Sequence, residues 1–285
     1  MADIRKVRRR IKGVTNIAKI TRAMEMIAAS KMKKAQERGL AGRPYSEKIR
    51  QVISDLAALT GIEFQHPLLQ RRPLERIAVV HITPDRGLCG GLNANLNRGL
   101  VGFILEHKDV PVNIIAVGRK GRDFAVRQGC DMKAEFTQLS DKPSLLDTLP
   151  ISHIIIDEYS AGLIDMVYIS YARFISTMVQ KPVIEQLLPV ESAVIPKSEN
   201  VDYIYEPGAE VVLGGLLPRF LEMQVYHAIL ESIASEQSAR MVAMRSATDS
   251  ANELISDLTL LYNKARQEAI TRELLDITGG VAALE

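Results

Sequence analysis

The chain has 285 residues, of which 47% are hydrophobic and 25% are charged, and its formal net charge is +2. This composition is typical of a globular protein of one or two domains and excludes a disordered chain. Two cysteines exclude a disulfide framework, and the five histidines show no ligand spacing, so we expect no metal site. The sequence contains neither a membrane span nor the apolar core of a signal peptide, so we expect a cytoplasmic protein.

Residues 1–58 are predicted to form one long helix. Its apolar residues recur at alternating steps of three and four, which is the pattern of a coiled coil. They define two seams that are offset by a three-residue step, the first with Ile4, Val7, Ile11 and Val14 and the second with Ile17, Ile20, Met24 and Ile27. We expect the helix to kink at Arg43 and Pro44.

Residues 74–200 are predicted to form a domain in which strands alternate with helices. Apolar runs indicate buried strands at 76–83, 112–117, 132–136 and 166–171, and an edge strand at 181–188. Helices are predicted at 92–107 and 122–128, and a further one is expected to start near Pro150. Alternation of this kind predicts a mostly parallel, Rossmann-like sheet.

The C-terminal segment, residues 209–285, is predicted to be a second long helix. No proline follows Pro218, and no glycine lies between Gly215 and Gly279, so only the start of the helix is left open. A helix of this length must extend beyond a compact domain and needs a partner for its apolar stripe. The stripe again has coiled-coil spacing and consists of Met244, Thr248, Ala251, Ile255, Leu258, Tyr262, Ala265 and Ala269.

Charge favours pairing of the two terminal helices with each other. Residues 1–38 carry twelve basic and three acidic side chains, whereas residues 208–285 carry six basic and eleven acidic ones. Opposite charges within one chain favour an antiparallel intramolecular pair, although each exposed ion pair contributes only about 0.2 to 1 kcal/mol. The predicted fold class is therefore α/β, with an antiparallel coiled coil of the terminal helices added to a Rossmann-like domain.

A glycine-rich turn follows the first predicted strand, with the sequence DRGLCGGLN at residues 85–93. Glycine-rich turns between a strand and a helix can bind phosphate through free backbone N–H groups. This turn has neither the P-loop nor the G-x-G-x-x-G spacing, so a structural role in close packing is favoured over nucleotide binding. Cys89 is open to two interpretations, a reactive thiol or a small packing residue, and the second is favoured.

Other chemistry-bearing patterns are weak. The sequence contains no nucleophile elbow and no local Ser, His and Asp set, so no catalytic residues are predicted. The basic run Arg8-Arg9-Arg10 could contact nucleic acid phosphates, but no aromatic residues are interleaved with it and the acidic C-terminal segment competes for it. We therefore expect no nucleic acid partner.

Four blocks of sequence resemble the gamma subunits of F-type rotary ATP synthases. They are ITRAMEMIAASKM at 20–32, DRGLCGGLN at 85–93, ARMVAMRSATDSANELI at 239–255 and YNKARQEAIT at 262–271. The blocks occur in the family's order along the whole chain. The resemblance implies a central shaft that rotates inside a ring of alpha and beta subunits and couples transmembrane proton flow to ATP synthesis or hydrolysis at the beta subunits. It implies no cofactor and no catalytic residue in this chain.

The resemblance also implies which residues meet partner chains. Met24 matches the shaft methionine that faces a loop of the beta subunit, and Arg266 and Gln267 match the pair that hydrogen-bonds the beta-subunit loop gripping the shaft. Arg8 and Arg9 match basic shaft positions by location alone.

At the other end of the family's shaft, Tyr203 and Glu206 resemble residues that face the c-ring, beside the epsilon subunit. The resemblance places the chain at the cytoplasmic face of the cell membrane, as a peripheral subunit. Residues 191–202 contain no cysteine, so the thiol regulation of the plant chloroplast form is not expected. The alternative function, from another class, is a nucleotide-binding Rossmann-like enzyme that dimerises through coiled-coil arms.

Overall fold

The computed structural model describes residues 2–60, 66–190, 206 and 208–282. The chain forms two compact units, one made of Met1–Ala28 and Met241–Glu285 and the other of Ala29–Arg240. No helix among the described residues is long and apolar enough to cross a membrane.

Two long helices, α1 (Ala2–Thr60) and α5 (Ala209–Ala282), occupy the two ends of the chain. Pro44 lies inside α1, so the helix assignment continues through the position where a kink was expected. Pro218 lies inside α5, which begins at Ala209, and the glycine pair before this proline therefore does not delay the start of the helix. Packing of an apolar face outweighs the local cost of these residues.

The unit Ala29–Arg240 contains a five-stranded sheet with the order β3-β2-β1-β4-β5. Its strands are β1 (Ile77–Ile82), β2 (Val112–Val117), β3 (Met132–Phe136), β4 (Met166–Phe174) and β5 (Gln180–Leu188). The first four are parallel, and β5 pairs antiparallel with β4 at the edge. The order 3-2-1-4 is that of a Rossmann-like sheet, as the sequence predicts.

Three α-helices connect the strands, and η2 (Pro67–Leu69) is a short 3-10 turn before β1. They are α2 (Leu92–Glu106), α3 (Arg119–Gln128) and α4 (Leu145–Ser160). The expected start of α4 near Pro150 is wrong, because the helix begins five residues earlier. Ser144 and Asp147 form a capping box at this start, in which the Asp147 carboxylate accepts from the Ser144 backbone N–H at 2.8 Å and from its hydroxyl at 2.9 Å.

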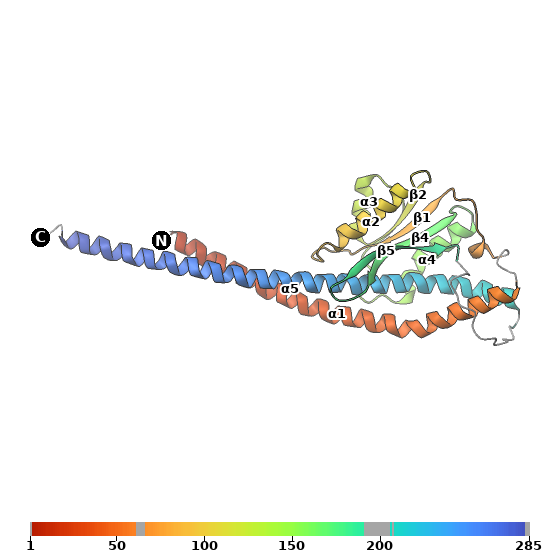
Figure 1. Ribbon diagram of the computed structural model, residues 1–285, viewed down its shortest axis with the longest axis horizontal. Helices are drawn as coiled ribbons and strands as arrows, with labels where there is room; N and C mark the ends of the chain where they lie inside the picture. The colour runs from red at the N-terminus through yellow and green to blue at the C-terminus, as the bar shows by residue number, and fades with distance from the viewer. Residues whose placement is uncertain (1, 61–65, 191–205, 207, 283–285) are drawn as a thin grey trace. The chain divides into compact units, whose positions relative to one another are not determined.

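The sheet is covered on both faces (Figure 1). Alternate residues of β1 point to opposite faces, so all six positions of this strand are buried. Ile77 and Val79 pack against α2 and α3, whereas Ala78 and Val80 belong to a larger core with α4 and the sheet-facing parts of α1 and α5.

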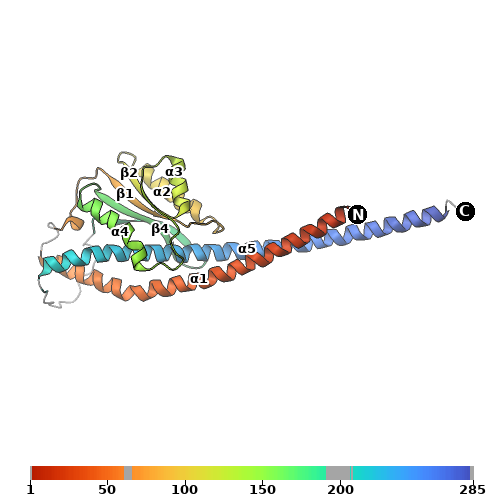
Figure 2. The same ribbon diagram turned by 180° about the vertical axis from the view of Figure 1, so that it is seen from behind.

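In the unit formed by the two chain ends, α1 and α5 lie side by side in both views (Figures 1 and 2). Thr21 contacts Thr248 and Glu25 contacts Arg245, so residue numbers rise along one helix as they fall along the other. The pair is therefore antiparallel, which confirms the predicted fold class.

The seam of α1 differs from the predicted one. Ile17, Ile20 and Ile27 are 54%, 59% and 55% exposed, whereas the small side chains of Ala18 and Ala28 are buried at the contact. The heptad of Ile4, Val7, Ile11 and Val14 thus continues without a three-residue step. The larger isoleucines dominate the sequence pattern, but close approach of the helices selects the small residues.

Candidate functional site: the paired ends of the chain

The helix pair is held by small and polar side chains at its centre. The hydroxyls of Thr21 and Thr248 lie 2.7 Å apart and are both buried. One turn away, Arg245 donates to the carboxylate of Glu25 at 3.0 Å. On the α5 side, the predicted seam is correct, because Met244, Ala251 and Leu258 are buried like Thr248. Small residues bring the two backbones close and leave the larger side chains on the outside.

Arg266 and Gln267 are both exposed, on α5. If the register of Thr21 and Thr248 continues along the pair, Ile4 lies opposite Ala265. The amino end of α1 therefore lies beside Arg266 and Gln267. Ile4 and Ala265 are partly buried, whereas the described residues from Ile270 onward are exposed. Beyond Arg266 and Gln267, α5 therefore continues without α1 beside it. Their polar groups are available to another chain.

The remaining predicted shaft residues also lie on this unit. Met24 is partly buried beside the seam, and Arg8 and Arg9 are exposed. Arg5, Arg8, Arg9 and Lys12 together line one open pocket on the first turns of α1. Four clustered cations favour an acidic partner surface.

Of the two residues predicted to face the c-ring, Glu206 is exposed and lies three residues before the start of α5 at Ala209. Tyr203 lies outside the described residues. The structure therefore places Met24, Arg8, Arg9, Arg266 and Gln267 on one unit, with Met24 far along the helix pair from Arg266 and Gln267, and it places Glu206 on the other unit.

Exposed apolar side chains were missed as candidates, and the sequence pattern had assigned three of them, Ile17, Ile20 and Ile27, to the seam. On α1 they are Ile17, Ile20, Met26 and Ile27, and on α5 they are Leu254, Leu260, Leu261, Ile270, Leu274, Leu275 and Ile277. The sequence did indicate that some apolar residues would be exposed, because both helices carry more of them than one seam can bury. Large apolar side chains that are uncovered on a regular helix pair indicate contact with other chains.

The nucleotide alternative depends on the crevice at the carboxyl ends of β1 and β4, where the strand order reverses. In this structure α5 fills that crevice. Ala239 packs with Cys89, Leu92 and Ala172 in one buried cluster. Arg240 donates to the carbonyl of Gly87 at 3.2 Å. Burial raises the pKa of the Cys89 thiol, which agrees with the packing interpretation of this residue.

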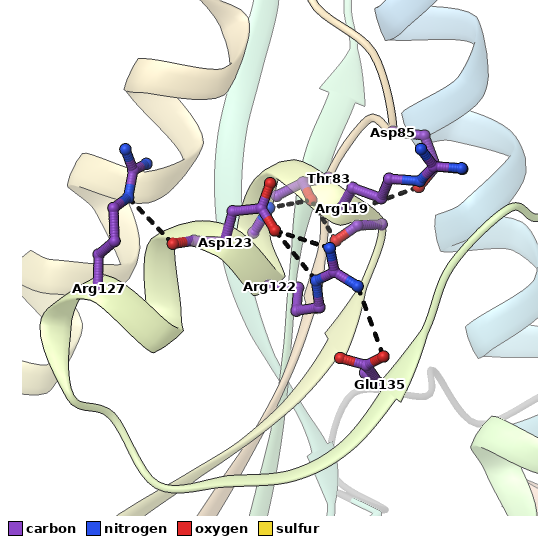
Figure 3. A network of polar contacts seen from close by, with 9 residues as sticks. Thr83, Asp85, Arg119, Arg122, Asp123, Arg127 and Glu135 are labelled. Atoms are coloured by element: carbon purple, nitrogen blue, oxygen red, sulfur yellow. Dashed lines mark hydrogen bonds and ion pairs between the residues drawn. The ribbon is translucent and has the colours of Figure 1, made fainter.

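The amino end of α3, a second potential phosphate site, is filled by the chain itself (Figure 3). The N–H groups of Arg119 and Gly121 donate to the Asp85 carboxylate and the Thr83 hydroxyl, at 2.9 and 2.7 Å. Those of Lys120 and Arg122 donate to the carbonyls of Pro84 and Gly118. All four N–H groups of the first turn therefore have acceptors.

The same region is bounded by ion pairs rather than by an open cation cluster. Arg122 contacts Asp123 at 2.9 Å and Glu135 at 3.5 Å (Figure 3). Among the residues that the structure describes, no group of three or more His, Cys, Asp or Glu side chains could hold a metal ion.

The fold and the exposed faces of the helix pair define a subunit that binds other chains along a coiled coil. A family model described as ATP synthase matches residues 3–284. The ATP synthase gamma chain of Dehalococcoides mccartyi is 66% identical over 285 residues, covering 100% of both chains. That of Chloroflexus aurantiacus is 50% identical over 288 residues, which cover 100% of this chain and 99% of the relative. The chain belongs to the gamma-chain family of ATP synthases.

Solved structures agree with this assignment. The central stalk and c-ring structure of the Tetrahymena thermophila mitochondrial ATP synthase contains a chain that is 27% identical, with a TM-score of 0.62, over 80% of this chain and 99% of that one. A rotor chain of the Euglena gracilis mitochondrial enzyme shares the fold at 20% identity, with a TM-score of 0.64, over 94% of this chain and 99% of that one.

Family membership establishes the function as that of the gamma subunit, in the central stalk of a membrane-associated complex. Catalysis in ATP synthase takes place on the beta subunits, so this chain is a non-catalytic subunit. The rotor interpretation is thus supported over the nucleotide-binding enzyme.

Proposed function

We propose that the paired helix ends rotate inside a ring of alpha and beta subunits and that Arg266 and Gln267 bind the beta subunit. The observation that carries this proposal is the exposure of both side chains where α5 begins to continue without α1. A guanidinium next to an amide can bind a carboxylate and a carbonyl of one partner loop together. Met24, three residues from Thr21 and beside the seam, contacts the beta subunit, and Arg8 and Arg9 bind acidic groups of the ring.

The opposite end of the assembly is proposed to involve Tyr203 and Glu206, which bind the c-ring and the epsilon subunit. The related Tetrahymena structure comprises a central stalk together with a c-ring, which supports this partner. Functionally, the chain divides into a helix at 1–58, a base domain at 74–200 and a helix at 209–285. The complex couples proton flow to ATP synthesis and lies at the cytoplasmic face of the cell membrane.

Reconstitution of an ATP synthase complex that contains Arg266→Ala tests the role of this residue. Loss of one charge-assisted hydrogen bond, roughly 1.5 to 3 kcal/mol, should lower the rate of ATP synthesis on the order of tenfold. The complex should still assemble, because Arg266 is exposed and packs against no core. The matched control is Lys264→Ala, which removes the same charge from an exposed position two residues away.

The proposal predicts a control complex with wild-type synthesis and an Arg266→Ala complex with reduced synthesis at equal assembly. Equal synthesis rates in the two variants would refute the role of Arg266. Failure of the wild-type chain to join an alpha and beta ring would instead refute the rotor function itself.

A further inference from the structure

The glycine-rich turn at residues 85–93 contacts α5. Leu88 and Gly90 adopt left-handed backbone, with φ of 63° and 60°, on either side of Cys89. Cys89 is only 1% exposed, and it packs against Ala239 of α5. The side chain of Asn93 donates to the Cys89 sulfur at 3.3 Å, which ties the turn to the start of α2. The turn is therefore a rigid surface on which α5 lies.

The same stretch of α5 donates two side-chain hydrogen bonds, one to β4 and one to the turn between β4 and β5. Ser235 donates to the carbonyl of Ala172 in β4 at 2.8 Å, and Ser238 donates to the carbonyl of Thr177, between β4 and β5, at 2.9 Å. Both serines are buried. Residues three or four apart lie on one face of a helix, so Ser235, Ser238 and Ala239 all face the sheet.

Arg240 projects from another side of the helix and adds a contact through a largely buried ion pair. Its guanidinium lies 2.6 Å from Glu236, and the two side chains are only 11% and 16% exposed. Burying two charges is costly unless both are well paired. Here the pair fixes the guanidinium where it also reaches the Gly87 carbonyl at 3.2 Å. Burial raises the pKa of the Glu236 carboxyl, and the charge of Arg240 opposes that effect.

The position of these contacts along α5 gives them a mechanical meaning. Arg240 is the last residue of α5 that belongs to the sheet-containing unit. The large core between α5 and the sheet ends earlier, at Ile229 and the partly buried Ile233. Apolar packing has no preferred direction around the helix axis, whereas hydrogen bonds to fixed carbonyls do. Residues 235–240 are thus the final point at which the sheet fixes the rotational position of α5.

We propose that Ser235, Ser238, Ala239 and Arg240, held against the turn at 85–93 and the β4–β5 hairpin, form a clamp that transmits torque between α5 and the sheet domain. The three acceptor carbonyls lie on three different segments of the domain, so a rotation of the helix in either direction stretches at least one bond. The clamp rests on the proposed rotation of this subunit. It gives the glycine-rich turn a role as a positioning element for the stalk helix.

The test uses the assembled ATP synthase complex with the double variant Ser235→Ala and Ser238→Ala. This change removes the two hydrogen bonds that the serines donate, and the longer one that Ser238 accepts from Gln180 at 3.4 Å, without leaving a buried charge unpaired. The matched control replaces two exposed serines of the same helix, Ser246→Ala and Ser250→Ala. The measurements are ATP hydrolysis, protons pumped per ATP hydrolysed, and the angular fluctuation of a bead attached to the sheet domain.

The clamp variant should hydrolyse ATP within about twofold of wild type, but it should pump about half as many protons per ATP and show wider angular fluctuation. If the serines had only a structural role, the variant would lower the amount of complex. The protons pumped per ATP and the angular fluctuation would then stay unchanged. Pumping and fluctuation equal to those of the control, at equal assembly, would overturn the clamp. A wild-type complex that hydrolyses ATP without pumping would overturn the rotor function instead.

A second variant keeps the proposal testable if the double variant does not assemble. Ala239→Cys places a second thiol beside Cys89, and oxidation then joins the turn covalently to α5. Because the clamp holds these residues together throughout rotation, the oxidised complex should pump as well as the reduced one. Loss of pumping on oxidation that a reductant restores would show that the helix moves on the turn, and would overturn the clamp.

Discussion

Acid should destabilise this protein through one histidine in the middle of its sheet. His81 of β1 is 0% exposed, and its ring nitrogens lie 3.0 Å from the Ser170 hydroxyl and 3.1 Å from the Asn97 side-chain oxygen. Burial lowers its pKa from 6.5 to about 4, and the hydrogen bond from the ring to Asn97 only partly offsets that effect. Between these two values the unfolded chain binds a proton that the folded chain excludes.

The sign and the size of the effect follow from this difference. Stability from His81 is complete above its unfolded pKa of 6.5 and falls as the pH drops toward about 4. At 1.36 kcal/mol for each unit, the loss over this window is about 3 kcal/mol. Urea unfolding of the full chain at about pH 7 and about pH 4.5, followed by circular dichroism, measures it.

The comparison variant is His81→Gln, which cannot titrate and should lose about 3 kcal/mol less than wild type between the two pH values. Ser170→Ala is the control, because it removes a hydrogen bond of about 1 kcal/mol but keeps the histidine, and so should retain the wild-type pH dependence. Identical pH dependence in wild type and His81→Gln would refute the reasoning.

Two further predictions concern packing. Gly118→Ala should lower the free energy of unfolding by about 3 kcal/mol or more, because a Cβ would lie 1.9 Å from the Thr83 carbonyl oxygen at a φ of 97°. Thermal unfolding measures this loss. Gly102→Ala is the control that should not be destabilised, because a Cβ there would have no atom within 4 Å. Ala28→Leu should lower the free energy of unfolding by about 1 to 3 kcal/mol by overfilling the seam, whereas Ile27→Ala should change it by no more than about 0.5 kcal/mol. Urea unfolding measures both, and the reverse order of the two effects would support the seam predicted from the isoleucines instead.

Much of the fold was accessible from sequence because its signals are local. The runs at 76–83 and 112–117 are mostly apolar, with no strict alternation of polar residues, which is typical of parallel strands covered on both faces. The start of α4 was missed because Pro150 suggested a first helical position, although Ser144 and Asp147 have the spacing of a cap.

The α1 side of the coiled-coil seam could not be predicted from hydrophobicity alone, although the α5 side was. Ile17 and Ala18 are adjacent, and only the distance between the two backbones decides which one is buried. Since that distance is set by both helices together, the pattern of α1 by itself favours the larger residue. The correct choice follows from the small residues in the seam of α5, such as Ala251, which require a close approach.

The functional residues also fall into two groups, those that the sequence indicated and those that only the structure identifies. Arg266 and Gln267 came from a resemblance of sequence, and the structure adds their exposure where α5 continues without α1. The contacts of Ser235 and Ser238 have no sequence signal, because a serine in a helix is ordinarily a solvated residue. Only the position of β4 and of the β4–β5 hairpin identifies them as donors to the sheet.

The filled amino end of α3 has a consequence for how the domain responds to its surroundings. A protein that binds a ligand only when folded becomes more stable as the ligand concentration rises. Here Asp85 supplies from within the chain the negative charge that a phosphate would bring to a helix start. The stability contributed by that helix start therefore does not depend on the supply of phosphate compounds. For a subunit of ATP synthase, this means that a change in the ADP or ATP concentration leaves the start of α3 equally stable.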